Sequence, residues 1–518
     1  MVKDCNDLPE GYTDMLISKS AASLIRGLTI VIATSASVAA QDAMTLEQVE
    51  TAYKAEDFAT ARAGLVGLAE AGDMTAQYRL GFMIANSMGG EFDRAEAIRW
   101  LEAAIAQGYG SANLLLARSY LTGNPEVPDY ERAAELLALE VETGSAEAHY
   151  YLGQLYRIGR GVQGDPPRGF ELLRKAAGAN VADAQFALAE MYSRGEGTAP
   201  DAAQASRWLL QAAEGGSAEA QMSLYFNYAR GTGFPKNEAL ALQWLTEAAN
   251  RDHTLAQRIL GSSLLLGEGI EANTDLGLQY LRRAAQKGEA GAQSNLGYAY
   301  MTGVGVEKDV AQALEWYQLA AEQGLTRAAL VTGELYQSEE LGEPDIEQAI
   351  KYYKIALMGK DDTAASRLGA LLASGVIPPE EEPEQGVVWV AMAAEQGDAV
   401  ALDWLIARAD SNEQYASMRL GLIYADGIGT DADPAKAAPY LDRAARAGLV
   451  EAQERLADLF ASGSGVEQDY VEAHMWANVA AANGSDSAAE RRDLLANLMT
   501  ADQVAEAQAR AKAVLASE

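Results

Sequence analysis

The chain has 518 residues, of which 49% are hydrophobic, and a formal net charge of −34 at pH 7. The apolar content is ample for a buried core, whereas the acidity disfavours nucleic acid and anionic membranes, which are bound mainly through cationic side chains. A basic protein, a cationic peptide or a divalent cation would be attracted instead, although solubility alone is the plainer explanation of the charge.

Residues 15–40 have the features of a secretory signal. Lys19 and Arg26 precede a mainly apolar, uncharged run that is too short and too rich in Ser, Thr and Ala to predict a membrane span. Val38 and Ala40 suit signal-peptidase cleavage directly after the latter residue. The alternative is an uncleaved anchor.

Residues 1–14 are acidic and polar, unlike the basic start of a signal peptide, so we expect this stretch to be a non-native extension and Met15 to be the true start. The one cysteine, Cys5, lies in this extension, and a mature chain without cysteine suits an oxidising compartment. We therefore predict a bacterial protein that is periplasmic, of the Gram-negative type, or secreted, with no integral membrane span in the mature chain.

We expect residues 41–71 to form a divergent helical cap. From residue 72 to residue 396 the sequence repeats with a period of 36 residues. Each of the nine units begins with a glycine or a residue in its place: Gly72, Gly108, Gly144, Asn180, Gly216, Asp252, Gly288, Gly324 and Lys360. Asn and Asp are natural substitutes for glycine where the backbone turns left-handed. Such regularity predicts a repeat array.

Each unit predicts two helices joined by a turn that contains two glycines. In the unit that begins at Gly288, the spacing places three side chains on one face of the first helix: Ala292, Leu296 and Tyr300. Asp309 is expected to cap the second helix. Six of the seven tryptophans share one place in the second helix, which predicts core residues: Trp100, Trp208, Trp244, Trp316, Trp389 and Trp476.

The pattern A-x-x-x-L-G-x-x-Y-x-x-G-x-G-V-x-x-D-x-x-x-A-x-x-W-x-x-x-A-A-x-x-G resembles the Sel1-like repeat, a relative of the tetratricopeptide repeat. The resemblance covers about residues 72–484. It implies an all-α fold, a right-handed α-solenoid of about eleven 36-residue helix-turn-helix repeats with divergent caps at both ends. It also implies a concave surface, lined largely by the first helices, that binds other proteins or peptides.

The array departs from its pattern at several places. Pro125 and Glu126 replace turn residues of the second unit, and Glu339 and Leu341 replace both glycines of the eighth, so we expect these two turns to differ. We expect the acidic, proline-rich sequence at 377–386 to form a long solvated loop. The alternative is a loop that binds a basic partner.

The end of the chain returns to the period after an interruption. Residues 397–411 are expected to be an inserted half-repeat, and residues 412–483 to form two further repeats. Residues 484–518 predict a C-terminal helical cap, which repeat arrays need at their ends.

The sequence offers no catalytic, cofactor or metal site. His149, His253 and His474 fall at different places in units far apart, whereas a metal or acid–base centre needs converging side chains. No nucleophile, zinc-protease or phosphate-loop motif occurs in the mature chain. Some members of the resembling family are linked to β-lactam binding or hydrolysis, but they are cysteine-rich. We predict that the protein is not an enzyme.

A peptide-binding stripe is the remaining candidate site. Aromatic residues recur at two places in the first helices of the early units, and five of them are expected to form the stripe: Phe82, Phe226, Tyr298, Tyr150 and Phe186. Rigid aromatic side chains commonly anchor a bound partner. The alternative is ordinary packing between neighbouring first helices.

Three functions are therefore compared. The first is an exported, non-catalytic scaffold, adaptor or regulator that binds a protein or peptide, which could be basic, in its concave surface. The second is an envelope enzyme or a β-lactam- or peptidoglycan-binding protein of the cysteine-rich Sel1-like type. The third is a purely structural spacer. The oligomeric state is not predicted.

Overall fold

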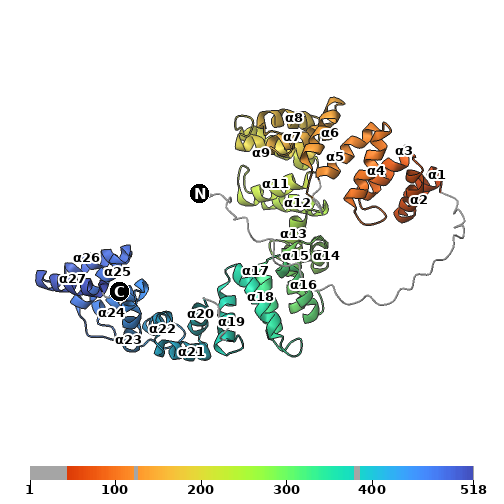
Figure 1. The fold of residues 1–518 in the computed structure, drawn as a ribbon. Helices are drawn as coiled ribbons and strands as arrows, with labels where there is room; N and C mark the ends of the chain where they lie inside the picture. Colours follow the sequence, from red (N-terminus) through yellow and green to blue (C-terminus); the bar gives the residue numbers. More distant parts are fainter. Residues whose placement is uncertain (1–43, 122–126, 379–384, 517–518) are drawn as a thin grey trace, which may run out of the picture. The chain divides into compact units, whose positions relative to one another are not determined.

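A computed structural model describes residues 44–121, 127–378 and 385–516, and all regular structure in these ranges is helical. The chain divides into two compact units, Met1–Leu137 and Ala138–Glu518. Within each unit, successive helices pack against one another in chain order, as Figure 1 shows. The prediction of an all-α solenoid is confirmed.

The described part of the first unit contains these elements: α1 (Leu46–Lys54), α2 (Phe58–Glu70), α3 (Met74–Ala85), α4 (Arg94–Ala106), the 3-10 turn η1 (Gly110–Ala112) and α5 (Asn113–Leu121). Helix α6 (Tyr130–Glu142) crosses the division between the units.

The second unit continues with helix pairs: α7 (Ala146–Ile158) and α8 (Pro166–Gly178), α9 (Ala182–Arg194) and α10 (Ala202–Glu214), α11 (Ala218–Arg230) and α12 (Glu238–Asn250), α13 (Thr254–Leu266) and α14 (Thr274–Gln286), α15 (Ala290–Thr302) and α16 (Val310–Glu322), α17 (Thr326–Gln337) and α18 (Ile346–Met358), α19 (Asp362–Ala373) and α20 (Gly386–Glu395).

After α20 comes a single helix, α21 (Ala399–Asp410), which packs against both α20 and α22. The pairs then resume with α22 (Gln414–Asp426) and α23 (Pro434–Arg446), and α24 (Val450–Ser462) and α25 (Tyr470–Ala482). Helices α26 (Asp486–Ala496) and α27 (Ala501–Leu515) both pack on α25.

Helix ends follow the expected chemistry. Asp309 caps α16 by accepting a hydrogen bond from the Gln312 amide at 3.0 Å, and its own amide donates to the Tyr300 carbonyl at 2.9 Å. Asn180 and Asp252 adopt positive φ values of 62° and 64°. Both substitutes therefore turn left-handed, as predicted.

The two helices of a repeat approach closely where one of them carries glycine. A Cβ added at Gly297 of α15 would lie 2.8 Å from ring atoms of Tyr317 in α16, so the tyrosine ring packs directly on the glycine backbone. Tyr317 is buried, and this burial raises the pKa of its phenol to about 12. The residue next to the repeated tryptophan thus fills the interface in this repeat.

The repeated tryptophans lie deeper in some repeats than in others. Three are buried: Trp100, Trp389 and Trp476. Three are only partly buried and pack against the rim of a core cluster: Trp208, Trp244 and Trp316. The prediction of core residues is therefore correct for three of them and too strong for the other three, which keep part of the indole in solvent.

A repeated glutamine connects neighbouring repeats. Its side-chain Nε2 donates to the backbone carbonyl eight residues earlier, near the end of the preceding second helix, in six places: Gln77 to Ala69, Gln185 to Ala177, Gln221 to Ala213, Gln257 to Ala249, Gln293 to Ala285 and Gln453 to Ala445. All six side chains are buried. Each adds a second hydrogen bond to a carbonyl that already accepts the backbone amide three residues later, as the Ala213 carbonyl accepts from the Gly216 amide at 3.1 Å.

The glutamine is missing from the middle of the second unit. Ala329 and Ala365 take its place, and Ser417 makes a longer contact of 3.5 Å to the Ala409 carbonyl. In this region one apolar cluster runs continuously from Ala313 to Ile423, whereas the glutamine-bearing repeats before it contain several small clusters.

The two atypical turns have different outcomes. Pro125 and Glu126 lie outside the described residues, as do residues 379–384 of the acidic loop at 377–386. In the eighth repeat, α17 is followed by Ser338 in an extended conformation, with φ −83° and ψ 162°, where the regular turns have a left-handed glycine. This turn differs as predicted.

The glutamine bond predicts a measurable contribution to stability. Replacing Gln221 with Met keeps the volume but removes one of the two hydrogen bonds that the buried Ala213 carbonyl accepts, so we expect the free energy of unfolding to fall by about 1 kcal/mol. Urea unfolding followed by circular dichroism measures the change. Gln286→Met, on the exposed surface of α14, is the control and should change little; equal losses in both variants would contradict a role for the bond.

The regular turn predicts a second effect. Gly197 has a φ of +70°, and an added Cβ would lie 2.3 Å from the Pro166 carbonyl oxygen, whereas Gly233, with φ +72°, has open space there. We expect Gly233→Ala to cost about 1–2 kcal/mol of left-handed strain. Gly197→Ala should cost clearly more in the same urea assay, because backbone must move. Equal costs would show that the close approach is unimportant.

Candidate functional site

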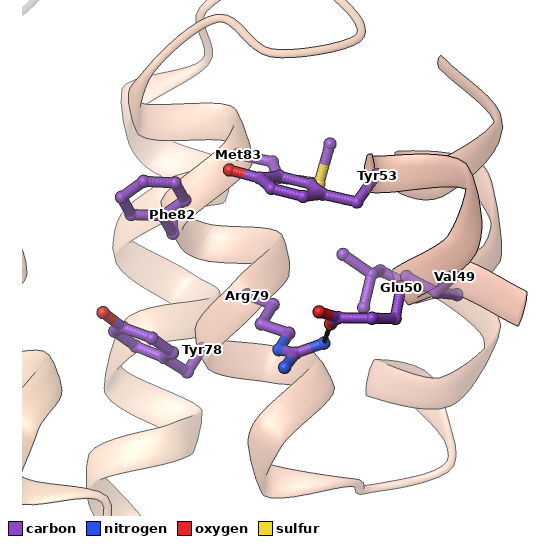
Figure 2. Close-up of a pocket in the computed structure, with 8 residues that line it drawn as sticks. Val49, Glu50, Tyr53, Tyr78, Arg79, Phe82 and Met83 are labelled. Carbon is purple, nitrogen blue, oxygen red and sulfur yellow. Dashed lines mark hydrogen bonds and ion pairs between the residues drawn. The ribbon is translucent and has the colours of Figure 1, made fainter. Parts of the chain in front are cut away.

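A pocket of about 260 Å³ lies between α1 and α3 in the first unit, with α2 at its base. Its lining is mainly apolar and is shown in Figure 2: Val49, Glu50, Tyr53, Leu65, Tyr78, Arg79, Phe82 and Met83. Helical spacing explains the arrangement, because residues four apart share one face of a helix. In α1 this pairs Val49 with Tyr53.

The base of the pocket is fixed by the hydrophobic core. Val49, Leu65 and Met83 are buried and belong to one apolar cluster, against which Phe82 also packs while remaining partly exposed. A capping box at Thr45 fixes the start of α1, since the side chains and backbones of Thr45 and Gln48 bond reciprocally. The capping box thereby stabilises the first turn of the short α1.

Aromatic contacts hold two rings of the wall in place. Tyr53 meets Phe58 edge-on, with ring centroids 5.4 Å apart, and Tyr78 stacks on Tyr109 at 4.7 Å. Burial raises the pKa of Tyr78, so its phenol stays neutral at physiological pH. Tyr53 is 36% exposed, and the pocket is therefore open to solvent beside this ring.

A charged pair forms the polar edge of the pocket. Arg79 Nη1 donates to Glu50 Oε2 at 2.6 Å, and Lys54 Nζ lies 3.5 Å from the other carboxylate oxygen. The hydrogen bond from Arg79 lowers the pKa of Glu50, so the carboxylate stays ionised at neutral pH. Figure 2 shows this pair bridging α1 and α3 below the Tyr53 ring.

The arrangement suits binding better than catalysis. Three aromatic rings, a methionine and aliphatic side chains surround a space below the usual 300–1,000 Å³ of small-molecule sites. No histidine, cysteine, serine or threonine lines it. The pocket can therefore enclose one or two side chains of a larger partner, with the Glu50–Arg79 pair available for hydrogen bonds to that partner's backbone.

The predicted site residues do not all meet in one place. Phe82 lines the pocket of the first unit, and Phe186 lines a second pocket of about 360 Å³ formed by α9, α10, α11 and the turn that follows. Tyr150 and Phe226 are partly buried and pack against two separate core clusters. Tyr298 is 43% exposed. The continuous stripe itself stays a prediction.

Sequence reasoning missed the contribution of α1 to the site. Residues 41–71 were interpreted only as a divergent cap, yet α1 supplies Val49, Glu50 and Tyr53. The four-residue spacing of Val49 and Tyr53 was a visible signal of a shared face. The 36-residue period could not predict the role of α1, because this helix lies before the first regular unit.

The histidines make structural contacts. His149 Nδ1 lies 2.8 Å from the Ser145 carbonyl oxygen, and His253 caps α13 by accepting from the Ala256 amide at 3.2 Å. His474 is buried, and this burial lowers its pKa, so it is neutral at pH 7. Among the described residues, no group of three or more His, Cys, Asp or Glu side chains could hold a metal ion.

None of the helices in the described ranges is both long and apolar enough to cross a membrane.

The helix pairs, their left-handed boundaries and their order of packing define an α-solenoid repeat protein. The profile of the Sel1 repeat matches eleven segments: residues 75–109, 110–139, 146–181, 182–217, 217–253, 254–289, 290–325, 327–361, 363–398, 414–449 and 450–485. The chain belongs to the Sel1 repeat family. Sel1 repeat proteins are generally protein-interaction scaffolds.

Solved structures resemble the chain to different degrees. The protective antigen c5321 of uropathogenic Escherichia coli, which displays the same repeat fold, is 28% identical, with 88% of this chain and 94% of that chain covered and a TM-score of 0.47. A Sel1 repeat protein from Oxalobacter formigenes is 33% identical, with 44% and 94% covered and a TM-score of 0.40. Yeast Tom70 is 12% identical, with 90% and 94% covered and a TM-score of 0.21. Comparison with curated protein sequences gave no match.

Proposed function

We propose that this protein is an exported, non-catalytic scaffold or adaptor that binds a protein or peptide partner, with the pocket between α1 and α3 as an anchoring site. The observation that carries the proposal is the aromatic, open pocket over a fixed apolar base. Membership of a family of interaction scaffolds supports the general role.

The pocket favours a side chain of a macromolecule as its occupant. Binding energy at protein interfaces concentrates in a few apolar or aromatic anchors that fill well-packed pockets. A space of about 260 Å³ accepts such an anchor, and the base formed by Val49, Leu65 and Met83 is already packed before binding. Little ordering entropy is then lost on association, which favours affinity.

The ion pair at the edge supports recognition of a polypeptide backbone. Glu50 accepts and Arg79 donates hydrogen bonds, and both side chains are partly exposed beside the apolar space. A peptide amide and carbonyl next to the anchoring side chain complement these two groups. The wider surface of a chain with net charge −34 favours a partner that is basic overall.

Export places the partner in the cell envelope. The proposal rests on the sequence of residues 15–40, in which a short apolar run follows basic residues and ends in a cleavage-like site. The mature chain would be periplasmic or secreted and free of cysteine.

Removing the aromatic anchors tests the binding site. The double variant Tyr53→Ala with Phe82→Ala should lose a partner captured from envelope extract, with affinity reduced about thirty-fold or more, since hot-spot aromatics contribute 2 kcal/mol or more. Quantitative capture with identification of bound proteins measures this. Tyr415→Ala, which removes another exposed tyrosine, is the control. A partner retained equally by all three proteins would refute the site.

Processing tests the export proposal. In a Gram-negative host we expect the chain in the periplasm with Gln41 as its first residue, as read by mass spectrometry of the mature N-terminus. Ala40→Asp should block cleavage, because the residue before the cut must be small, whereas Ala39→Asp should be tolerated. A cytosolic chain that begins before Gln41 would contradict export.

A further inference from the structure

The atypical turn of the eighth repeat has the same length and the same closing hydrogen bond as a regular turn, but its backbone conformation differs. The Asp345 amide donates to the Tyr336 carbonyl at 2.8 Å, just as the Asp309 amide donates to the Tyr300 carbonyl at 2.9 Å in the repeat before. Between these fixed ends, Leu341 occupies the place of the second glycine. The turn must therefore bulge differently while its ends stay in register.

The second glycine matters because several regular turns press it against the preceding second helix. An added Cβ would lie 2.3 Å from the Pro166 carbonyl at Gly197, 3.1 Å from Thr274 Cβ at Gly305, and 2.2 Å from the Pro434 carbonyl carbon at Gly465. A leucine cannot sit so close to a neighbouring helix. The turn that contains Leu341 therefore cannot close onto α16 in the way these three turns close.

A pocket of about 300 Å³ lies where that contact is absent, between α16, the end of α17 and the atypical turn. It is lined by Ala311, Leu314, Glu315, Leu335, Tyr336, Ser338, Leu341, Glu343 and Asp345. Leu335 is buried in the core, whereas Leu341 is 39% exposed. The pocket thus has an apolar base and an apolar side chain at its opening.

The charged residues that line this pocket are all carboxylates: Glu315, Glu343 and Asp345. Asp345 caps α18 by accepting from the Gln348 amide, while Glu343 makes no hydrogen bond or ion pair with the described residues. Lys308 Nζ lies 3.9 Å from Glu340, which stands next to Leu341 in the turn.

The comparable pocket beside α10 differs in charge. It contains Arg194, whose guanidinium lies 3.3 Å from Glu190, so its lining carries both signs. The lining of the α16 pocket contains three carboxylates and no cation. Charge complementarity therefore selects a cationic occupant there, and it selects against an acidic one.

We propose that the pocket formed by α16 and the turn at 338–345 binds a basic segment of the partner, in which a leucine-like side chain is flanked by lysine or arginine. The inference rests on the proposed scaffold function and assigns the second contact of that partner. The apolar side chain fills the space beside Leu314 and Leu341, and the flanking cations pair with Glu315 and Glu343.

The probe is a fluorescein-labelled dodecapeptide in which single leucines alternate with pairs of lysines. Its binding to the full chain is followed by fluorescence polarisation at 150 mM salt, where long-range attraction is largely screened. We expect the double variant Glu315→Gln with Glu343→Gln, and separately Leu341→Ser, each to weaken binding about ten-fold. A peptide of equal charge with serine in place of leucine should bind the unaltered protein about ten-fold more weakly.

Two matched variants control for general acidity and exposed apolar surface. Glu307 stands two residues before the capping Asp309, as Glu343 stands before Asp345, and Ile428 is an exposed apolar residue between the glycines of a regular turn. Glu307→Gln and Ile428→Ser should leave binding unchanged. Equal weakening by these controls, or equal binding of the serine peptide, would overturn the proposal in favour of diffuse attraction.

The captured partner separates this inference from the scaffold function itself. A partner lost by the Tyr53 and Phe82 variant but fully retained by the Glu315 and Glu343 variant would overturn the second contact and leave the first. Partial loss in each variant, with Glu307→Gln unchanged, is the expected result. Retention by both variants would count against both proposals.

Discussion

A buried hydrogen bond from a glutamine side chain links neighbouring repeats at six places in the array. A helix end leaves backbone carbonyls without intrahelical partners, and an unpaired carbonyl in the interior is costly. In six repeats a glutamine near the start of the first helix, such as Gln185 or Gln257, donates to a carbonyl at the end of the preceding helix. Because the donor comes from the next repeat, each of these bonds forms only when two repeats stack, and it adds to the bond that the same carbonyl accepts from the boundary residue.

The turns between the two helices of a repeat can differ in sequence without changing the register of the array. The amide of the capping residue donates to the carbonyl nine residues before it in both the regular turn at Asp309 and the atypical turn at Asp345. The residues between these two hydrogen-bonded positions can include two glycines in a tight turn or bulkier side chains in a different conformation. The array thus keeps its spacing while its surface varies, which is what a scaffold with specific contacts requires.

The sequence predicted most of the structural features that recur from repeat to repeat, but not those that occur at a single place in the chain. The period, the left-handed boundaries such as Asn180 and the capping aspartates were predictable, since each has one local chemical cause. The glutamine bond was missed, although the residue follows the pattern alanine in six repeats. The pocket at Tyr53 could not be foreseen, because it arises from packing of a divergent helix against a regular one, and half-burial of Trp316 likewise depends on its neighbours.

The unequal distribution of the glutamine gives the second unit a graded response to temperature. Repeats from Gln185 to Gln293 join small apolar clusters through buried hydrogen bonds, whereas the stretch from Ala329 to Ser417 relies on one continuous apolar cluster. Apolar association weakens on cooling, because its driving force near room temperature is mainly entropic. Cooling therefore weakens the contacts of the middle repeats by a larger share than those of the repeats that precede them, whose glutamine hydrogen bonds do not depend on this entropic term.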